Sequence, residues 1–497
     1  NQWTYNLGQL LKVWQLTGNP DVFSLIRRQA RRITAPGMYG RLNPDRLPFD
    51  DKSSIGYGRD VDCGRTRSGY LPEQMGFDGQ YTIEQVMNMA PIWRVTNEPA
   101  ILDWWSSFYI LKTHLTLPKW GTHTSHYFRD TCSPTDINFR TRYYTHKTGL
   151  PEAARPLVPY ADLWGPAEVA QSPREPWPCL ADASFVKNID NKFYFIKTGG
   201  YYSVVYAGPR SPLWTKFYMS DVSNQSVRFR GYGGAGYGGW GWNPTKVGGL
   251  SAVFVENCGP TLLAQNHNVT DTNVVWIRRK TPVSPLEAQD TNASVTCSGY
   301  AQPVASFDAE KRVYELTEKL PHTPLTVSRS IRFEDDAIAV DLKLTAHEDV
   351  AFEDVYHALP YMADRRNLTY FDADLRKIST AATPEALLTP SRPRHPDPDI
   401  EEARTNLPAV RCRAFDVAAD SGAGATVILD EDYPLLHIRP VRYRKIAAAV
   451  GSLNVPLPAR LKKNQSVNLR YVIVPHQDAM TEKTVRRLVD AHHPGTN

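Results

Sequence analysis

Long apolar runs are missing from this sequence, and so are the familiar signatures of nucleotide and nucleic-acid chemistry. No stretch approaches the roughly 20 apolar residues that a membrane-spanning helix needs. The chain has no Walker loop, dinucleotide fingerprint or Gly-x-Ser-x-Gly elbow. It also has no RNP, zinc-finger or basic-helix pattern. We therefore expect neither a membrane nor a nucleic acid as partner.

Cysteine is scarce and widely spaced, with six residues in 497 and no Cys-x-x-Cys pair that would indicate a zinc or redox site. Five Asn-x-Ser/Thr sequons begin at Asn224, Asn268, Asn292, Asn367 and Asn464. Together these features favour a secreted or periplasmic glycoprotein with at least one disulfide. No signal peptide is visible and the chain opens at an apparent helix start, so we expect a mature or trimmed product.

Aromatic residues are abundant, with 12 Trp, 25 Tyr and 17 Phe. Aromatic faces stack on sugar rings but also fill ordinary cores, so the count suits a carbohydrate-active protein without proving one. The net charge of +5 favours anionic partners at long range. Four arginines cluster at Arg27, Arg28, Arg31 and Arg32, and we interpret them as a solvated helix face.

The first part of the chain has helical periodicity. One apolar stripe at positions i, i+3, i+4 and i+7 is formed by Leu7, Leu10, Leu11 and Trp14. Similar patterns predict helices from Asp21, near 82–95 and over 98–115, joined in pairs by short turns into helical hairpins. The proline-rich stretch 151–178 forbids a long helix or a central strand and marks the domain boundary.

The second part has the periodicity of strands. Residues 338–344 alternate apolar and polar, and the segments 193–205, 251–255, 273–277, 426–429, 435–441 and 468–474 also read as strands. No helical pattern alternates with them, which favours antiparallel sheets stacked as a sandwich over a βαβ fold. Only the residues from Met480 look helical again. We predict an α+β protein with helical hairpins over 1–160, an antiparallel β-sandwich over 161–497, and an exposed insertion near 380–408.

Residues 69–81 form the most suggestive polar segment. They read Gly-Tyr-Leu-Pro-Glu-Gln-Met-Gly-Phe-Asp-Gly-Gln-Tyr, with two carboxylates (Glu73, Asp78) and two phenols (Tyr70, Tyr81) just before a helical pattern. A polar loop held by a rigid scaffold is a usual way to build a site. The alternative is that Asp78 caps the next helix and the tyrosines pack.

A second unusual segment is rich in glycine and aromatic residues. Residues 231–241 read Gly-Tyr-Gly-Gly-Ala-Gly-Tyr-Gly-Gly-Trp-Gly. Glycine brings both backbone freedom and close approach. The segment is either a flexible aromatic loop that covers a site or the tip of a long hairpin.

Four short motifs follow one another in the second part: Gly200-Tyr201-Tyr202-Ser203-Val204, Gly248 to Phe254, Gly259-Pro260-Thr261-Leu262-Leu263 and Tyr356-His357-Ala358-Leu359-Pro360. In this order, and behind helical hairpins, they resemble the heparinase II/III-like polysaccharide lyases, in which an α/α toroid precedes an antiparallel β-sandwich. Two features depart from that group. The His-x-His-Ala-Asp segment expected before Leu250 is replaced by Asn243-Pro-Thr-Lys-Val-Gly-Gly. The helical part is also too short for a full toroid, which suggests that N-terminal hairpins are missing.

The resemblance implies cleavage of an acidic, uronate-containing polysaccharide by β-elimination. Tyr81 would be the catalytic acid/base, with Arg65 and Arg67 favouring its phenolate. Asn1 resembles the residue that neutralises the substrate carboxylate, and His123 and His126 are further catalytic candidates. The expected substrate contacts are Glu73, Asp78, Arg65, Arg67, Tyr202, Trp240, Trp242 and His357. His357 lies between apolar residues, so a satisfied core histidine is its alternative role.

Other readings remain open at this point. Glu73 and Asp78 could serve a glycoside hydrolase as paired carboxylates, with Asp60 and Asp62 in reserve, or the chain could bind glycans without turnover. We expect no cofactor; His267 with His357 is the one pair that would suit a structural zinc of the kind found in some relatives, although no ligand spacing supports it. Nothing in the sequence specifies the oligomeric state or the particular polysaccharide.

Overall fold

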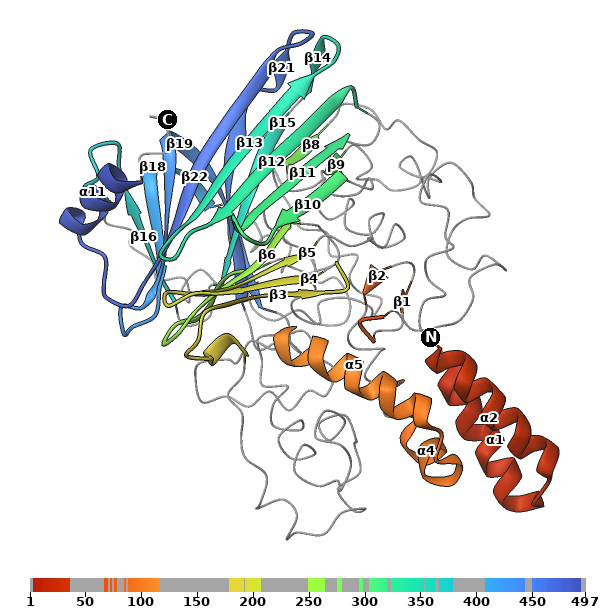
Figure 1. Ribbon diagram of the computed structural model, residues 1–497. Coiled ribbons are helices and arrows are strands. Elements are labelled where there is room, and N and C mark those ends of the chain that lie inside the picture. Colours follow the sequence, from red (N-terminus) through yellow and green to blue (C-terminus); the bar gives the residue numbers. More distant parts are fainter. Residues whose placement is uncertain are drawn as a thin grey trace, which may run out of the picture. The chain divides into compact units, whose positions relative to one another are not determined.

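The computed structural model describes a helical part and a larger β part of the chain (Figure 1). The described residues are 3–35, 67–69, 72–73, 76–77, 85, 88–115, 178–191, 193–206, 249–263, 275–278, 295–297, 304–319, 323–352, 354–362, 366–378, 407–442 and 449–492. The chain divides into two compact units, and the second begins its described part at Cys179. The boundary expected near residue 160 and the insertion expected near 380–408 lie outside the described residues.

The described part of the first unit consists of helices and one short hairpin. Its elements are α1 (Trp3–Thr17), α2 (Pro20–Thr34), β1 (Pro72–Glu73), β2 (Gly76–Phe77), α4 (Ala90–Thr96) and α5 (Pro99–Leu115). Helical hairpins were expected here and are present. A closed toroid is not seen in the described residues.

The α1–α2 hairpin forms because its turn has the residues that end one helix and begin the next. Gly18 adopts a left-handed φ of 65° and donates its N–H to the Trp14 carbonyl at 2.7 Å, which is a common way to end a helix. The Asn19 side chain then accepts from the Asp21 N–H, and Pro20 occupies the first helical position. The second helix therefore starts at Pro20 with Asn19 as its cap, slightly before the start expected at Asp21.

The predicted helix at 82–95 is interrupted in the structure. Gln85 and Asn88 are helical, Met89 lies in a turn, and α4 begins at Ala90. Pro91 explains the break, because proline lacks the N–H that a continuous helix would use. Helix α5 agrees with the predicted range 98–115. Its apolar positions are fully buried, as predicted, at Ile101, Trp104, Trp105, Phe108 and Leu111.

The second unit contains a five-stranded antiparallel sheet in the order β3-β4-β5-β6-β7. Its strands are β3 (Phe185–Ile189), β4 (Phe193–Lys197), β5 (Tyr202–Tyr206), β6 (Gly249–Val255) and β7 (Gly259–Leu263), preceded by the short 3₁₀ helix η4 (Pro178–Leu180). The predicted strand 193–205 is thus two strands, separated by a turn at Gly199 and Gly200.

A thirteen-stranded sheet makes up most of this unit, with the main order β10-β11-β12-β13-β22-β19-β20-β15-β8-β9. The strands are β8 (Val275–Arg278), β9 (Val295–Cys297), β10 (Val304–Asp308), β11 (Val313–Lys319), β12 (Leu325–Phe333), β13 (Ile338–Ala346), β15 (Asp354–Met362), β16 (Asn367–Phe371), β17 (Lys377–Ile378), β18 (Leu407–Ala418), β19 (Gly424–Arg442), β20 (Ala449–Leu457) and β22 (Ser466–His476). A separate pair is formed by β14 (Val350–Ala351) and β21 (Arg460–Leu461). Every strand pair among the described residues is antiparallel, as predicted.

The large sheet folds over so that its own strands face each other. Strand β19 pairs with β22 through Gly424–Leu429 and with β20 through Leu436–Arg442. Strands β15 and β22 are three positions apart in the order, yet His357 on β15 hydrogen-bonds Tyr471 on β22. Side chains so far apart in one sheet can meet only if the sheet encloses a core between its layers, as in a β-sandwich.

The five-stranded sheet shares that core. The ring centroids of Tyr194 on β4 and Phe307 on β10 lie 4.4 Å apart, and Val253 and Val255 of β6 belong to the same buried cluster as the large sheet. The C-terminal helix α11 (Glu482–Ala491) covers another part of the unit. It buries Val485 and Val489 against a second apolar cluster of the large sheet. No described helix has the length and apolar character needed to cross a bilayer.

Candidate active site

Gly69, the first residue of the polar segment 69–81, lies against α5. Gly69 has a left-handed φ of 91°, and its carbonyl accepts a hydrogen bond from the Trp104 indole at 2.5 Å. A Cβ at this position would lie 2.3 Å from the Phe108 backbone nitrogen. Only glycine allows this close approach, so the start of the segment is held against buried residues of α5.

A second anchor lies shortly after the segment, on α1. Thr4 is fully buried and its hydroxyl donates to the Gln85 side-chain oxygen. The Asn88 amide donates to the same Thr4 oxygen at 3.3 Å. These contacts join residues more than 80 positions apart in the sequence. Gln85 is itself buried, and its Nε2 has no hydrogen-bond partner in the part of the chain that the structure describes.

The short β1–β2 hairpin lies between the two anchors in sequence. It pairs Pro72 with Phe77 and Glu73 with Gly76. Glu73 therefore stands at the end of β1, next to the turn of the hairpin. Two of the predicted substrate contacts lie in this region. The structure describes the backbone of Glu73, and Arg67 is exposed two residues before Gly69.

Most of the other predicted site residues lie outside the described residues. These are Asn1, Arg65, Asp78, Tyr81, His123, His126, Trp240, Trp242 and His267, together with Asp60 and Asp62. Their catalytic and binding roles stay predictions.

Tyr202 and His357, both predicted to contact substrate, are fully buried in the β unit. The Tyr202 ring packs on Phe185 and Phe195. The His357 Nε2 lies 3.1 Å from the Tyr471 hydroxyl. Burial, reinforced by the positive charge of Arg329, holds the pKa of His357 well below its ordinary value. His357 is thus a neutral, buried histidine, although its Nδ1 has no hydrogen-bond partner among the described residues. Both side chains are buried, so neither is exposed for contact with a polysaccharide.

A second buried histidine joins two tyrosines of the sandwich core. The Tyr361 hydroxyl lies 2.6 Å from His437 Nε2, and the Tyr370 hydroxyl lies 3.0 Å from Nδ1. Burial raises the pKa of both tyrosines, so both are neutral hydroxyls. Strands β15, β16 and β19 supply the three residues, and no local sequence pattern indicated that they would meet.

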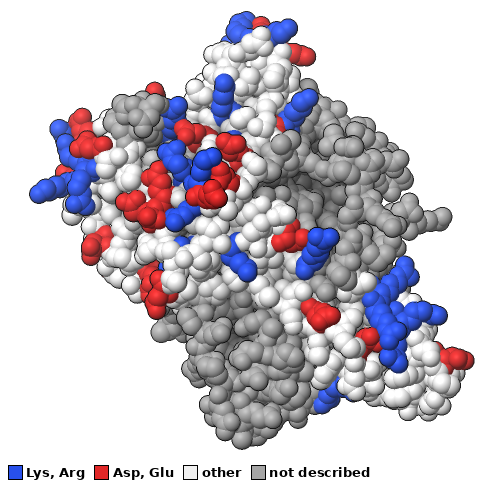
Figure 2. Space-filling view, in the orientation of Figure 1, with Lys and Arg blue, Asp and Glu red and all other residues white. Residues whose placement is uncertain are grey.

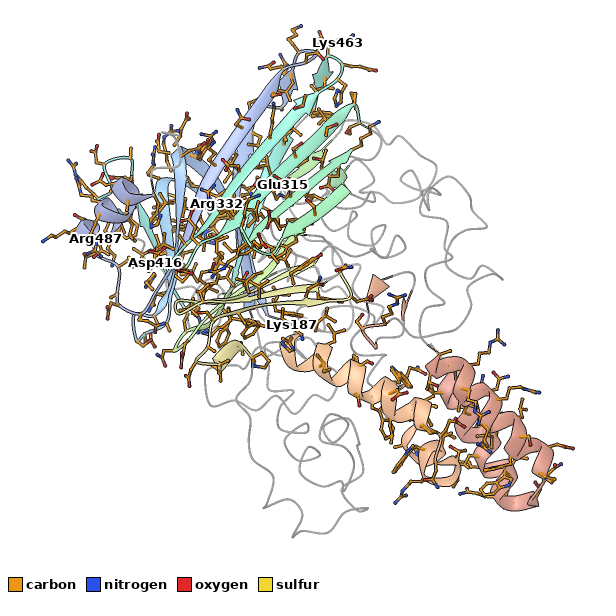
Figure 3. All side chains as sticks on the ribbon, in the orientation of Figure 1. Lys187, Glu315, Arg332, Asp416, Lys463 and Arg487 are labelled. Carbon is orange, nitrogen blue, oxygen red and sulfur yellow. The ribbon has the colours of Figure 1, made fainter. Side chains whose placement is uncertain are left out.

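A third polar cluster lies near the end of β22. His476 Nε2 is 2.7 Å from Asp416 Oδ1, and His476 Nδ1 is 2.8 Å from the Asp478 carbonyl. Both ring nitrogens therefore face acceptor oxygens. Thr426 also donates to Asp416 at 3.0 Å. Figure 3 shows Asp416 among these strands, near α11. The cluster ties β18, β19 and β22 together.

The described residues contain no group of three or more His, Cys, Asp or Glu that could hold a metal ion. Cys258 and Cys412 are buried free thiols and Cys179, also buried, is in no disulfide, so these three do not form the expected disulfide. Burial raises the pKa of Cys412 to about 12, which keeps that thiol unreactive. The polar clusters of the β unit are therefore structural, and the candidate site is the anchored segment of the helical unit.

Comparison with known proteins gives only distant likenesses. No protein-family model and no curated protein matches the chain. Heparan sulfate lyase HepC from Pedobacter heparinus matches with a TM-score of 0.41 and 10% identity, over 83% of this chain and 54% of that one. Heparinase III matches with a TM-score of 0.46 and 8% identity, over 83% and 55%. A galactose mutarotase-like protein from Lactobacillus casei matches with a TM-score of 0.32 and 10% identity, over 57% and 100%.

This chain thus spans about half the length of the two lyases, at 54% and 55%. All three TM-scores are below 0.5, so we base neither the fold nor the function of this chain on these likenesses.

Proposed function

We propose that the protein cleaves an acidic, uronate-containing polysaccharide by β-elimination, at a centre built on the anchored segment of the helical unit. The observation that carries this proposal is the contact of Thr4 with Gln85 and Asn88. In the sequence, Asn1 precedes Thr4 by three residues and Tyr81 precedes Gln85 by four. The two residues that the family resemblance assigns to carboxylate neutralisation and proton transfer thus stand just before anchors that hydrogen-bond each other.

The architecture also supports the proposal. The segments that carry the resemblance form strands β5, β6 and β7, which are neighbours in one sheet, and β15 in the other sheet. Helical hairpins precede an antiparallel β-sandwich along the chain, as in the toroid-plus-sandwich lyases. We propose that the hairpins are part of an α/α toroid. An anionic substrate agrees with the chain's positive net charge.

In the proposed reaction, Asn1 with His123 and His126 donates hydrogen bonds to the uronate carboxylate and stabilises the charge that develops on it. The Tyr81 phenolate takes the C5 proton, the C4=C5 double bond forms, and the bond from C4 to the leaving oxygen breaks. Tyr81 or one of the two histidines returns a proton to that oxygen. A free tyrosine has a pKa of about 10, so the cations Arg65 and Arg67 serve to favour the phenolate.

The test is a product assay on a panel of acidic polysaccharides, comparing wild type with Tyr81→Phe. Elimination leaves an unsaturated uronate that absorbs in the ultraviolet, and hydrolysis leaves none. We expect Tyr81→Phe to lower the elimination rate about 10²–10⁴-fold, the usual contribution of a general acid/base. The control is Tyr433→Phe, which removes a phenol that donates to Asp430 at 3.0 Å in the β unit and should leave the rate unchanged.

Three outcomes would contradict the assignment. A folded Tyr81→Phe variant with near-full elimination activity would make Tyr81 structural. Loss of turnover in Glu73→Gln or Asp78→Asn, without an ultraviolet product and without an effect of Tyr81→Phe, would indicate a glycoside hydrolase that uses these carboxylates. Binding without turnover of any polyuronate would indicate a non-catalytic glycan-binding protein.

A further inference from the structure

The positive charge of the described chain is concentrated in the helical unit. Its described residues include eight Lys and Arg against four Asp and Glu, whereas those of the β unit include 23 against 24. Figure 2 shows Lys and Arg side chains gathered over the α1–α2 hairpin, at the lower right of the view. Four of these cations are the arginines of α2. The excess positive charge is therefore local in the structure.

The four arginines form two adjacent rows on α2. Arg27 and Arg31 make one row and Arg28 and Arg32 the other, each with a spacing of four residues, or about 6 Å along the helix. The buried stripe of the same helix contains Ile26, Ala30 and Ile33. At about 100° per residue, the first row flanks this stripe and the second row is opposite to it. Arg28 and Arg32 are both exposed.

A buried carboxylate holds the first row in place. Glu98 is 5% exposed and lies in the turn between α4 and α5. Its Oε2 is 2.9 Å from Arg31 Nε and 3.5 Å from Arg27 Nε, while these arginine side chains remain 58% and 43% exposed. The single negative charge of Glu98 balances only one of the two guanidinium charges. A net positive charge therefore remains at the surface. The solvated face expected from the sequence is thus present, and Arg27 and Arg31 in addition form ion pairs with Glu98.

The spacing and the residue type suit an extended anion with regularly placed charges. Guanidinium groups bind carboxylate and sulfate groups through two parallel hydrogen bonds. Each exposed ion pair contributes little and is screened by salt, so a small anion that meets one arginine would bind weakly. A polymer that carries charge on successive units can meet both rows at once, and the prior ordering of Arg27 and Arg31 reduces the entropy lost on binding.

We propose that α2 carries a second binding face for anionic polysaccharide, formed by Arg27, Arg28, Arg31 and Arg32, none of which is among the residues proposed to react. The identity of the polymer rests on the proposed function, whereas the anion-binding property does not. A face of this kind retains long chains, and it has no effect on oligosaccharides too short to reach it.

The experiment measures binding to dextran sulfate, a polysaccharide without uronate that β-elimination cannot consume, by fluorescence anisotropy at low and high salt. Arg28→Ala/Arg32→Ala is compared with the charge-retaining Arg28→Lys/Arg32→Lys and with Lys483→Ala/Arg487→Ala. This last pair is the matched control, because it has the same spacing and is exposed on α11; Figure 3 labels Arg487 of this pair. Circular dichroism verifies that each variant is folded, and uncharged dextran is the ligand control.

We expect the alanine variant to bind about tenfold more weakly, from the loss of two exposed charge contacts, with a shallower salt dependence. The lysine variant should lose less and the α11 control should bind as wild type does. Equal binding by wild type and the alanine variant would overturn the inference, as would an equal loss in the α11 control. Tighter binding of single-stranded DNA than of dextran sulfate, lost in the same variant, would also overturn it, because the face would then select nucleic acid.

The two proposals fail in different ways. If wild type shows no elimination on any uronate polymer but the alanine variant loses dextran sulfate binding, the proposed function fails and the binding face stands. If elimination is present and the alanine variant keeps both its affinity and its KM for long chains, the binding face fails alone.

Discussion

Replacement of His437 by leucine is expected to destabilise the β unit strongly, because the imidazole is the shared partner of two buried hydroxyls. Tyr361 and Tyr370 approach its two nitrogens at 2.6 and 3.0 Å, and all three residues are buried. Each tyrosine hydroxyl therefore has an imidazole nitrogen as its hydrogen-bond partner, and leucine can neither donate nor accept.

The magnitude follows from the number of groups left without a partner. A buried polar group that loses its hydrogen bond costs about 1–3 kcal/mol, so His437→Leu should lower the free energy of unfolding by about 2–6 kcal/mol. Tyr370→Phe removes only the hydrogen bond to His437 Nδ1 and should lower the free energy of unfolding by about 1–3 kcal/mol. The triple variant His437→Leu/Tyr361→Phe/Tyr370→Phe removes both hydroxyls with the ring, so it should recover most of the loss.

The measurement is urea unfolding, with hydrogen exchange at β15, β16 and β19 to show that the loss is local to these strands. The control is Lys343→Ala on the exposed face of β13, where a change within about 0.5 kcal/mol is expected. The reasoning is refuted if His437→Leu is as stable as this control. It is also refuted if the triple variant is no more stable than His437→Leu, because the cost would then come from packing and not from unpaired hydroxyls.

Two further predictions concern the backbone and the pH dependence. Gly422→Ala should cost about 1–3 kcal/mol of stability, since Gly422 has a φ of 91° and a Cβ there would lie 2.6 Å from the Ala479 nitrogen. Gly8→Ala on α1 has open space around the new Cβ and should instead stabilise the protein by about 0.5–1 kcal/mol. Equal shifts of the melting temperature in the two variants would contradict this. His357 has a folded-state pKa well below 6.5, so its contribution to stability is complete above pH about 6.5 and is lost as the pH falls below that value, because the unfolded chain then binds a proton that the folded chain does not. Urea midpoints from pH 7 to 5 should therefore fall less steeply for His357→Gln than for wild type, and identical slopes would show that His357 does not titrate between the two states.

Several elements could be predicted from the sequence because their signals are local. The alternation at 338–344 lies in β13, where Ile338, Val340, Leu342 and Leu344 are buried while Asp341 and Lys343 are exposed. The apolar stripe of α5 is buried as predicted. The Gly18-Asn19-Pro20 turn joins α1 to α2, as predicted for the short turns between paired helices. The strands predicted at 426–429 and 435–441 proved to be one strand, β19. No local feature marks where one long strand leaves one partner and joins another.

The candidate site was only partly predictable. Sequence motifs placed Tyr202 and His357 among the substrate contacts, but both lie on strands whose residues are covered on each face, so alternation could not tell which side meets solvent. The anchor of Thr4 on Gln85 and Asn88 was not predictable, since it joins helices that are distant in sequence.

The sequence by itself determined the helical hairpins, the antiparallel strands and the net positive charge, because periodicity, caps and composition depend on neighbouring residues. Only the tertiary structure decided that His437 stands between Tyr361 and Tyr370, that Glu98 pairs with Arg27 and Arg31, and that Gly69 hydrogen-bonds Trp104 of α5. These contacts depend on strand order, register and helix packing. Those are set by the burial of the whole core and not by any local run of residues.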